Sequence, residues 1–62
     1  MCEAIVYINK EGKQEMVMEN VVTIRPKTDK LVLVDLFGET KEIDALIKEV
    51  KLVEHKVILE TK

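Results

Sequence analysis

Apolar residues along the chain come mostly in short runs that are rich in β-branched residues, with short polar clusters between them. Such runs, bounded by turn-forming residues, are typical of a compact all-β domain of short strands. We therefore expect a small barrel-like domain of six or seven antiparallel strands. In the first half of the chain the predicted strands cover residues 4–9, 13–18, 21–25 and 31–36.

Turn-forming residues separate these predicted strands. Residues 10–12 predict a hairpin turn, since Gly12 accepts a positive φ without steric cost. Pro26 ends the third strand because it has no N–H to donate, and residues 27–29 turn the chain into the fourth. Alternation along residues 13–18 places Met16 and Met18 on one face and Val17 on the other.

Two of the predicted strands, residues 4–9 and 31–36, carry apolar residues on both faces. A strand of this kind needs cover on both sides, whereas a strand with one apolar face needs it on one side only. In so short a chain we expect the second cover to come from an identical subunit. The pattern thus predicts a homodimer with these two strands near its interface.

The C-terminal half allows two interpretations. Apolar residues between Ile43 and Val57 also fit helical spacing, which would give a helix over about residues 44–53. Alternation in residues 50–52 and 57–59, on either side of a short connection at residues 54–56, instead predicts a hairpin. We favour the strands.

With 62 residues the chain forms one domain at most, residues 1–62. A domain of this size buries only about 60% of the surface that its unfolded chain exposes, so it needs an additional source of stability. A single cysteine excludes an internal disulfide, and the paired Cys and His spacings of structural zinc sites are absent. Oligomerisation is the remaining source of stability.

A net charge of −2 argues against a broad basic surface for nucleic acid and favours protein or metal partners. No segment approaches the roughly 20 apolar residues of a membrane span, and the N-terminus lacks the features of a signal peptide. We therefore expect a cytoplasmic protein, in a compartment where a free thiol stays reduced.

The one cysteine, Cys2, is the strongest candidate for chemistry. Its thiolate lies within chelating reach of the α-amine and first amides of the chain, whether or not Met1 is removed. Soft sulfur beside amine or amide nitrogen suits Ni²⁺ or a copper ion with planar preferences, and suits Ca²⁺ or Mg²⁺ badly. The alternative is that Cys2 serves simply as a small hydrophobic residue.

Other chemistry-bearing residues give weaker signals. One histidine, one cysteine and no serine leave little for catalysis, and a Cys2–His55 pair would lack an orienting third group, so we expect no enzyme. His55 is interpreted as a solvated turn residue, with a further metal ligand or a proton-linked interface contact as the alternative. Met16 and Met18 are expected in the core. Glu39, Glu42 and Asp44 would bind a hard cation only if a loop gathered them, and a solvated face is expected instead.

Small barrels also bind single-stranded nucleic acid, through exposed aromatic residues set in basic grooves. The two aromatic residues here are Tyr7, on a strand expected to be buried, and Phe37, expected to pack under a turn. Lysine and arginine are scattered among acidic residues. RNA or other nucleic-acid binding is therefore kept as the alternative function.

Four segments of the chain resemble the CooT family, and the resemblance extends nearly from end to end. They are Met1-Cys2-Glu3-Ala4, Val21-Val22-Thr23-Ile24-Arg25-Pro26, Leu36-Phe37-Gly38-Glu39 and His55-Lys56-Val57-Ile58-Leu59-Glu60. That family comprises small nickel-binding accessory proteins of carbon monoxide dehydrogenase maturation, whose members have also been predicted to bind RNA. The most specific element is the Met-Cys start on a very small all-β chain.

The resemblance implies that Cys2 holds Ni²⁺ in a homodimer and that a nickel enzyme is the client. It does not imply a ligand role for His55. The chain lacks a histidine-rich tail of the kind that other nickel chaperones carry. A twofold dimer with its N-termini near the axis would supply two thiolates and two nitrogens to one planar ion.

Overall fold

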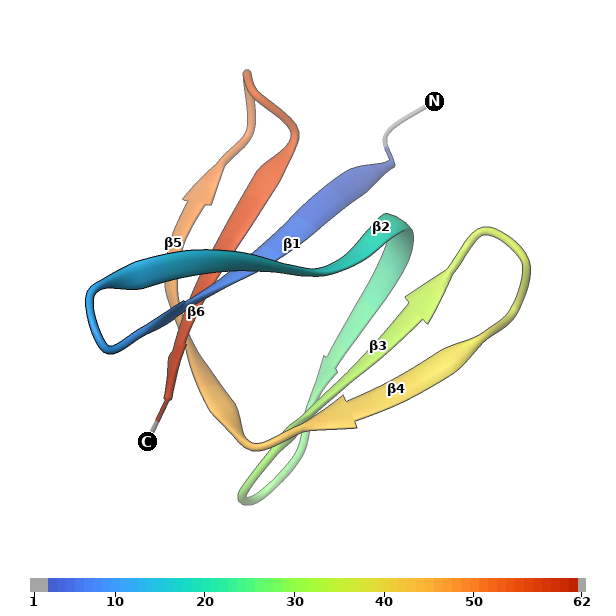
Figure 1. Ribbon diagram of the computed structural model, residues 1–62. Coiled ribbons are helices and arrows are strands. Elements are labelled where there is room, and N and C mark those ends of the chain that lie inside the picture. Colours follow the sequence, from blue (N-terminus) through green and yellow to red (C-terminus); the bar gives the residue numbers. More distant parts are fainter. Residues whose placement is uncertain (1–2, 62) are drawn as a thin grey trace.

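The computed structural model describes residues 3–61, which form six β-strands and no helix (Figure 1). The all-β class predicted from the sequence is thereby confirmed. No helix within these residues is long and apolar enough to cross a membrane. The strands are β1 (Ala4–Lys10), β2 (Lys13–Pro26), β3 (Leu31–Asp35), β4 (Thr40–Ile43), β5 (Ala45–Lys51) and β6 (Lys56–Thr61).

The strands form one sheet in the order β4-β3-β2-β1-β6-β5. Four of the five neighbouring pairs are antiparallel, but β1 and β6 are parallel, with Ile5 opposite Lys56 and Tyr7 opposite Ile58. The sheet is therefore mixed rather than wholly antiparallel as expected. The parallel pair arises because the β5–β6 hairpin adds to the free side of β1 with β6 innermost.

The two edge strands, β4 and β5, are separated in the chain by Asp44 alone. A flat sheet would hold its two edges far apart, so the sheet must curl until they meet at this residue (Figure 1). β4 and β5 are not neighbours in the hydrogen-bonded order, and the curled sheet stays open along this seam. The expected barrel thus describes the curvature of the sheet but not its closure.

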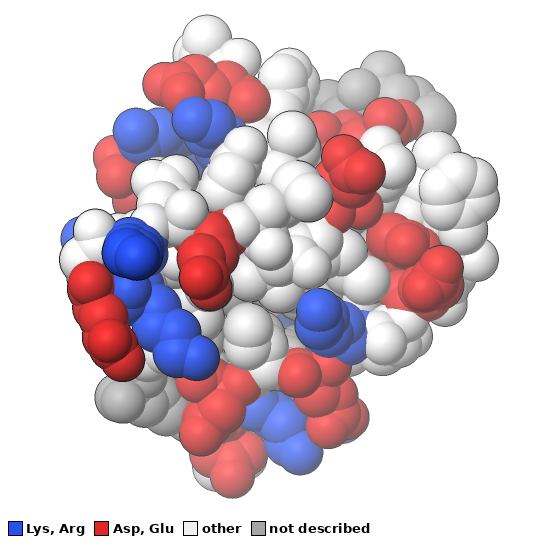
Figure 2. All heavy atoms as spheres, viewed as in Figure 1, with Lys and Arg blue, Asp and Glu red and all other residues white. Residues whose placement is uncertain are grey.

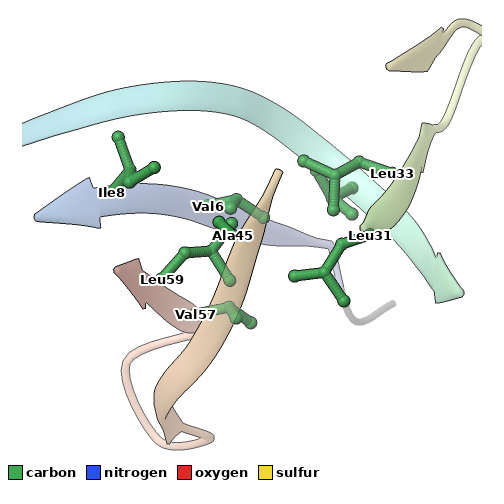
Figure 3. Packing of buried hydrophobic residues seen from close by; sticks show 8 residues of the cluster. Val6, Ile8, Leu31, Leu33, Ala45, Val57 and Leu59 are labelled. Atoms are coloured by element: carbon green, nitrogen blue, oxygen red, sulfur yellow. The ribbon is translucent and has the colours of Figure 1, made fainter. Parts of the chain in front are cut away.

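The concave face of the curled sheet holds the core (Figure 3). Leu33, Leu59 and Val6 are fully buried there and come from β3, β6 and β1. The core residues of these strands are spaced two apart, which is the period that places side chains on one face of a strand. The complete buried cluster is Val6, Ile8, Val21, Leu31, Leu33, Ala45, Val57 and Leu59.

Strand β2 replaces the two separate strands expected at residues 13–18 and 21–25. It runs for 14 residues and passes through Asn20, whose φ of 59° bends it without ending it. Val6 pairs with Met18 and Tyr7 with Met16, so β2 has one more residue than β1 here. Such a bulge interrupts strict alternation. Val17 and Met18 consequently both pack against the core, and the expectation that Met16 lies in the core is wrong because its side chain is 57% exposed.

The two strands with apolar residues on both faces, now β1 and β3, are largely covered within a single chain. Val32 lies on the outer face of β3 yet is only 7% exposed, and it pairs with Arg25 on one side and Glu42 on the other. Long polar side chains can cover an apolar neighbour with their aliphatic stems. The predicted homodimer is therefore not needed to bury these strands, although dimerisation itself stays a prediction.

The hairpin predicted for the C-terminal half is confirmed, and the alternative helix over residues 44–53 is wrong. β5 ends at Lys51, a turn covers residues 52–55, and β6 starts at Lys56. Val50 pairs with Val57 across the hairpin. β6 lies between β1 and β5 in the sheet, so residues 45–51 form its second hydrogen-bonded neighbour as a strand.

We predict that Leu59→Ala lowers the free energy of unfolding by about 2–5 kcal/mol, because it removes a fully buried side chain of an inner strand and leaves a cavity. Leu46→Ala is the control, since Leu46 is 52% exposed on the edge strand β5. Urea unfolding at a fixed protein concentration measures both. Equal losses in the two variants would contradict the core described here, while loss of cooperative unfolding in Leu59→Ala alone would support it.

Candidate metal centre at the N-terminal end

Cys2, the predicted nickel ligand, lies outside the described residues, but the residues that follow it are tied into the sheet. Ala4 is in register with Val21 of β2. The Ile5 N–H donates a hydrogen bond to the carbonyl oxygen of His55, with an N···O distance of 2.9 Å. The start of β1 is thus held between the bend of β2 and the β5–β6 turn (Figure 1).

The β5–β6 turn is held by its backbone at His55. This residue has a φ of 56°, a left-handed conformation that is unfavourable for any residue with a Cβ. Its N–H donates to the Leu52 carbonyl at 3.2 Å, while its own carbonyl accepts from Ile5. Both backbone groups of His55 are therefore used. The side chain is exposed in a turn, as expected from the sequence, and a ligand role for the imidazole stays a prediction.

The tip of the β5–β6 hairpin presents apolar side chains to solvent. Val50, Leu52 and Val53 have exposed fractions of 50%, 79% and 94%. A cleft of about 370 Å³ with mainly apolar walls lies at the same place. Its lining residues are Ala4, Val50, Lys51, Leu52, His55, Lys56 and Val57. The presence of Ala4 in this wall shows that the cleft adjoins the segment that leads to Cys2.

The β3–β4 turn lies on the other side of the start of β1. The Leu36 N–H donates to the Asn20 carbonyl at 2.8 Å, which fixes this turn to the bend of β2. One carboxylate oxygen of Asp35 accepts hydrogen bonds from the backbone N–H groups of Phe37 and Glu39, each at 2.9 Å. Phe37 is 76% exposed, so the expectation that it packs under the turn is wrong. Hydrogen bonds between backbone groups and to the Asp35 carboxylate hold the turn, so it does not need a buried aromatic ring beneath it.

The acidic residues considered as a hard-cation site are not gathered. Glu42 forms an ion pair with Lys30, with an N···O distance of 3.0 Å, and Asp44 lines the same shallow cleft. Glu39 belongs instead to the β3–β4 turn. Within residues 3–61 no three His, Cys, Asp or Glu side chains form a group that could hold a metal ion. Nickel binding at Cys2 stays a prediction.

The two aromatic residues do not form a joint platform for nucleic-acid bases. Tyr7 is half-buried on β1, with the ammonium of Lys56 placed 5.3 Å from the ring centre. Phe37 stands on a turn beyond β3, beside a cleft with three carboxylates. Nucleic-acid binding, the alternative function, stays a prediction. The positions of Tyr7 and Phe37 do not favour it.

Comparison with known proteins finds similarity along almost the whole chain. A family model described as CO dehydrogenase accessory protein CooT matches residues 1–60. An uncharacterized protein of Methanocaldococcus jannaschii is 40% identical over 60 residues, which cover 97% of this chain and 98% of that protein. A crystal structure assigned to CooT of Carboxydothermus hydrogenoformans superposes with a TM-score of 0.91 at 38% identity, covering 98% of each chain.

The ion pair between Lys30 and Glu42 changes the pH at which Glu42 titrates. The hydrogen bond from Lys30, aided by its positive charge, lowers the pKa of Glu42, and the same bond raises the pKa of Lys30. Glu42 therefore adds a small stabilisation at any pH above the pKa that it has in the unfolded chain. This stabilisation is lost as the pH falls through the lower pKa that Glu42 has in the folded chain. An NMR titration of the Glu42 carboxyl carbon should show a midpoint below the ordinary value of about 4.3. Lys30→Met should raise that midpoint, and an unchanged midpoint would contradict the pairing.

Proposed function

The chain belongs to the CooT family of CO dehydrogenase accessory proteins, and we propose that it serves this role by holding Ni²⁺ on Cys2 for delivery to a client enzyme. The family role is that of a helper protein and not of an enzyme. The observation that carries the proposal is the family match over residues 1–60, which includes Cys2. The anchored start of β1 supports it, since the chain leaves the sheet at a fixed point.

The chemistry of a terminal cysteine explains why nickel is the proposed cargo. An ordinary cysteine thiol has a pKa near 8.5, so only a few per cent is thiolate at neutral pH until a metal displaces the proton. Thiolate sulfur and adjacent backbone or terminal nitrogen form a chelate that favours a planar four-coordinate ion. Within residues 3–61 no three His, Cys, Asp or Glu side chains lie together to complete such a donor set.

A second copy of the chain would complete the donor set, and we place the dimer contact at the hairpin tip. Leu52 and Val53 are almost fully exposed there, beside the segment that leads to Cys2. The charges around the tip are mixed, with Glu54 and Lys56 in an ion pair at 3.6 Å, so two tips can face each other without strong repulsion (Figure 2). A twofold axis through this contact would bring the starts of the two β1 strands toward each other, because Ala4 lines the cleft at the tip. This location replaces the one expected over β1 and β3.

The first test is titration with nickel. Cys2→Ser should weaken Ni²⁺ binding by about a hundredfold or more, since oxygen is a poor substitute for thiolate at a soft site. Met16→Ser is the control, because it removes an exposed sulfur of β2 and should leave binding unchanged. Isothermal calorimetry gives affinity and stoichiometry, with one ion per two chains expected. Equal affinities for wild type and Cys2→Ser would contradict the proposal.

The second test concerns the dimer. The double change Leu52→Ser and Val53→Ser should convert a dimer into a monomer, because it removes the apolar surface at the tip. Leu46→Ser, at the other end of β5 with 52% exposure, should leave the mass unchanged. Sedimentation equilibrium measures both variants without and with nickel. A double variant that remains dimeric would exclude this contact.

A further inference from the structure

Phe37 is the only phenylalanine of the chain and is held out into solvent by a rigid turn. The Asp35 carboxylate accepts two backbone hydrogen bonds inside this turn, and Gly38, with a φ of 85°, donates its N–H to the Asp35 carbonyl at 3.1 Å. Asp35 in turn donates its N–H to the carbonyl of Glu39 at 3.0 Å. The backbone that carries the ring is therefore fixed before any partner arrives.

A fixed, exposed aromatic ring has the properties of an interface anchor. Aromatic residues are enriched at protein interfaces, and binding costs less when the contacting segment is already ordered. Leu36 stands next to the ring and is 45% exposed. Neither side chain belongs to the core or to the apolar residues packed against it, so the fold gives no internal reason for an aromatic residue at position 37.

The surroundings of Phe37 are acidic. A cleft of about 520 Å³ adjoins the ring, and its wall contains Glu19, Asp35 and Glu39. The one lysine in that wall, Lys41, directs its ammonium to the Val17 carbonyl at 3.5 Å. Acidic side chains gather on the side of the molecule that carries the β3–β4 turn, at the right of Figure 2.

This charge distinguishes the surface from the hairpin tip. A twofold contact through Phe37 would set Glu19, Asp35 and Glu39 against their own copies, and like charges brought together oppose association. The hairpin tip has charges of both signs beside it, from Glu54 and Lys56, and no such conflict. The occupant of the Phe37 surface must therefore be a different protein whose contact surface is basic.

We propose that Leu36 and Phe37, with the acidic rim of Glu19, Asp35 and Glu39, form the docking surface for the client enzyme. The matching surface on the client is an apolar pocket that receives the ring, bordered by lysine or arginine side chains. The inference rests on the accessory role of the family and not on nickel at Cys2. Docking and metal transfer use neighbouring parts of one end of the molecule, because the start of β1 lies beside the bend of β2 to which Leu36 is bonded.

The test measures binding of this chain to purified, nickel-free CO dehydrogenase from the same organism by biolayer interferometry. Phe37→Ser should weaken binding about tenfold or more, and Glu19→Gln with Glu39→Gln should weaken it less. Raising NaCl from about 0.05 M to about 0.5 M should weaken wild-type binding more than that of the glutamine variant. Leu46→Ser is the matched control, with a comparably exposed apolar side chain far from this surface, and should bind like wild type.

Several outcomes overturn the proposal. They are undiminished binding by Phe37→Ser, no measurable binding by wild type, or conversion of Phe37→Ser from dimer to monomer, which would identify a second copy as the occupant. Thermal melting confirms that the variant is folded. Cys2→Ser should still dock, so failure of the nickel site and failure of the docking surface give different results.

Discussion

The parallel pairing of β1 with β6 determines where the N-terminal segment and both turns beside it lie. It places β1 in the middle of the sheet, where Val6 is fully buried, and sets the beginning of the strand against the carbonyl of His55. An N-terminal strand at a sheet edge could separate from its single neighbour. Here the strand has hydrogen-bonded neighbours on both sides, so the segment leading to Cys2 starts from an ordered position.

The same arrangement explains how a very small protein presents several contact surfaces at one end. The curl of the sheet places the β5–β6 hairpin and the β3–β4 turn on either side of the start of β1 (Figure 1). One carries exposed aliphatic side chains with mixed charges, and the other carries an exposed aromatic ring with acidic neighbours. A short apolar core in the concave face is enough to hold both in place, because each turn is closed by its own backbone bonds.

Local pattern was enough to predict most of the strands and the hairpins between neighbouring ones, but not the pairing of strands that are distant in the chain. The turns at residues 10–12 and near 54–56, and the stop at Pro26, follow from residues that disfavour or permit particular backbone angles. The parallel β1–β6 pair, the continuous β2 and the exposure of Phe37 depend on partners that are distant in sequence, and alternation alone does not specify them. For the site, the sequence singled out Cys2, which lies outside the described residues. The exposure of Phe37 was not predicted, because a phenylalanine at a turn fits a buried ring and an exposed ring equally well.

We propose that one nickel ion is bound by sulfur from the start of the chain, in a centre shared by two copies. X-ray absorption at the nickel K-edge of the loaded protein tests it most directly, since it reports the ligand atoms themselves. A four-coordinate planar ion with two sulfur and two nitrogen neighbours is expected. A six-coordinate spectrum with oxygen and nitrogen neighbours and no sulfur would contradict it.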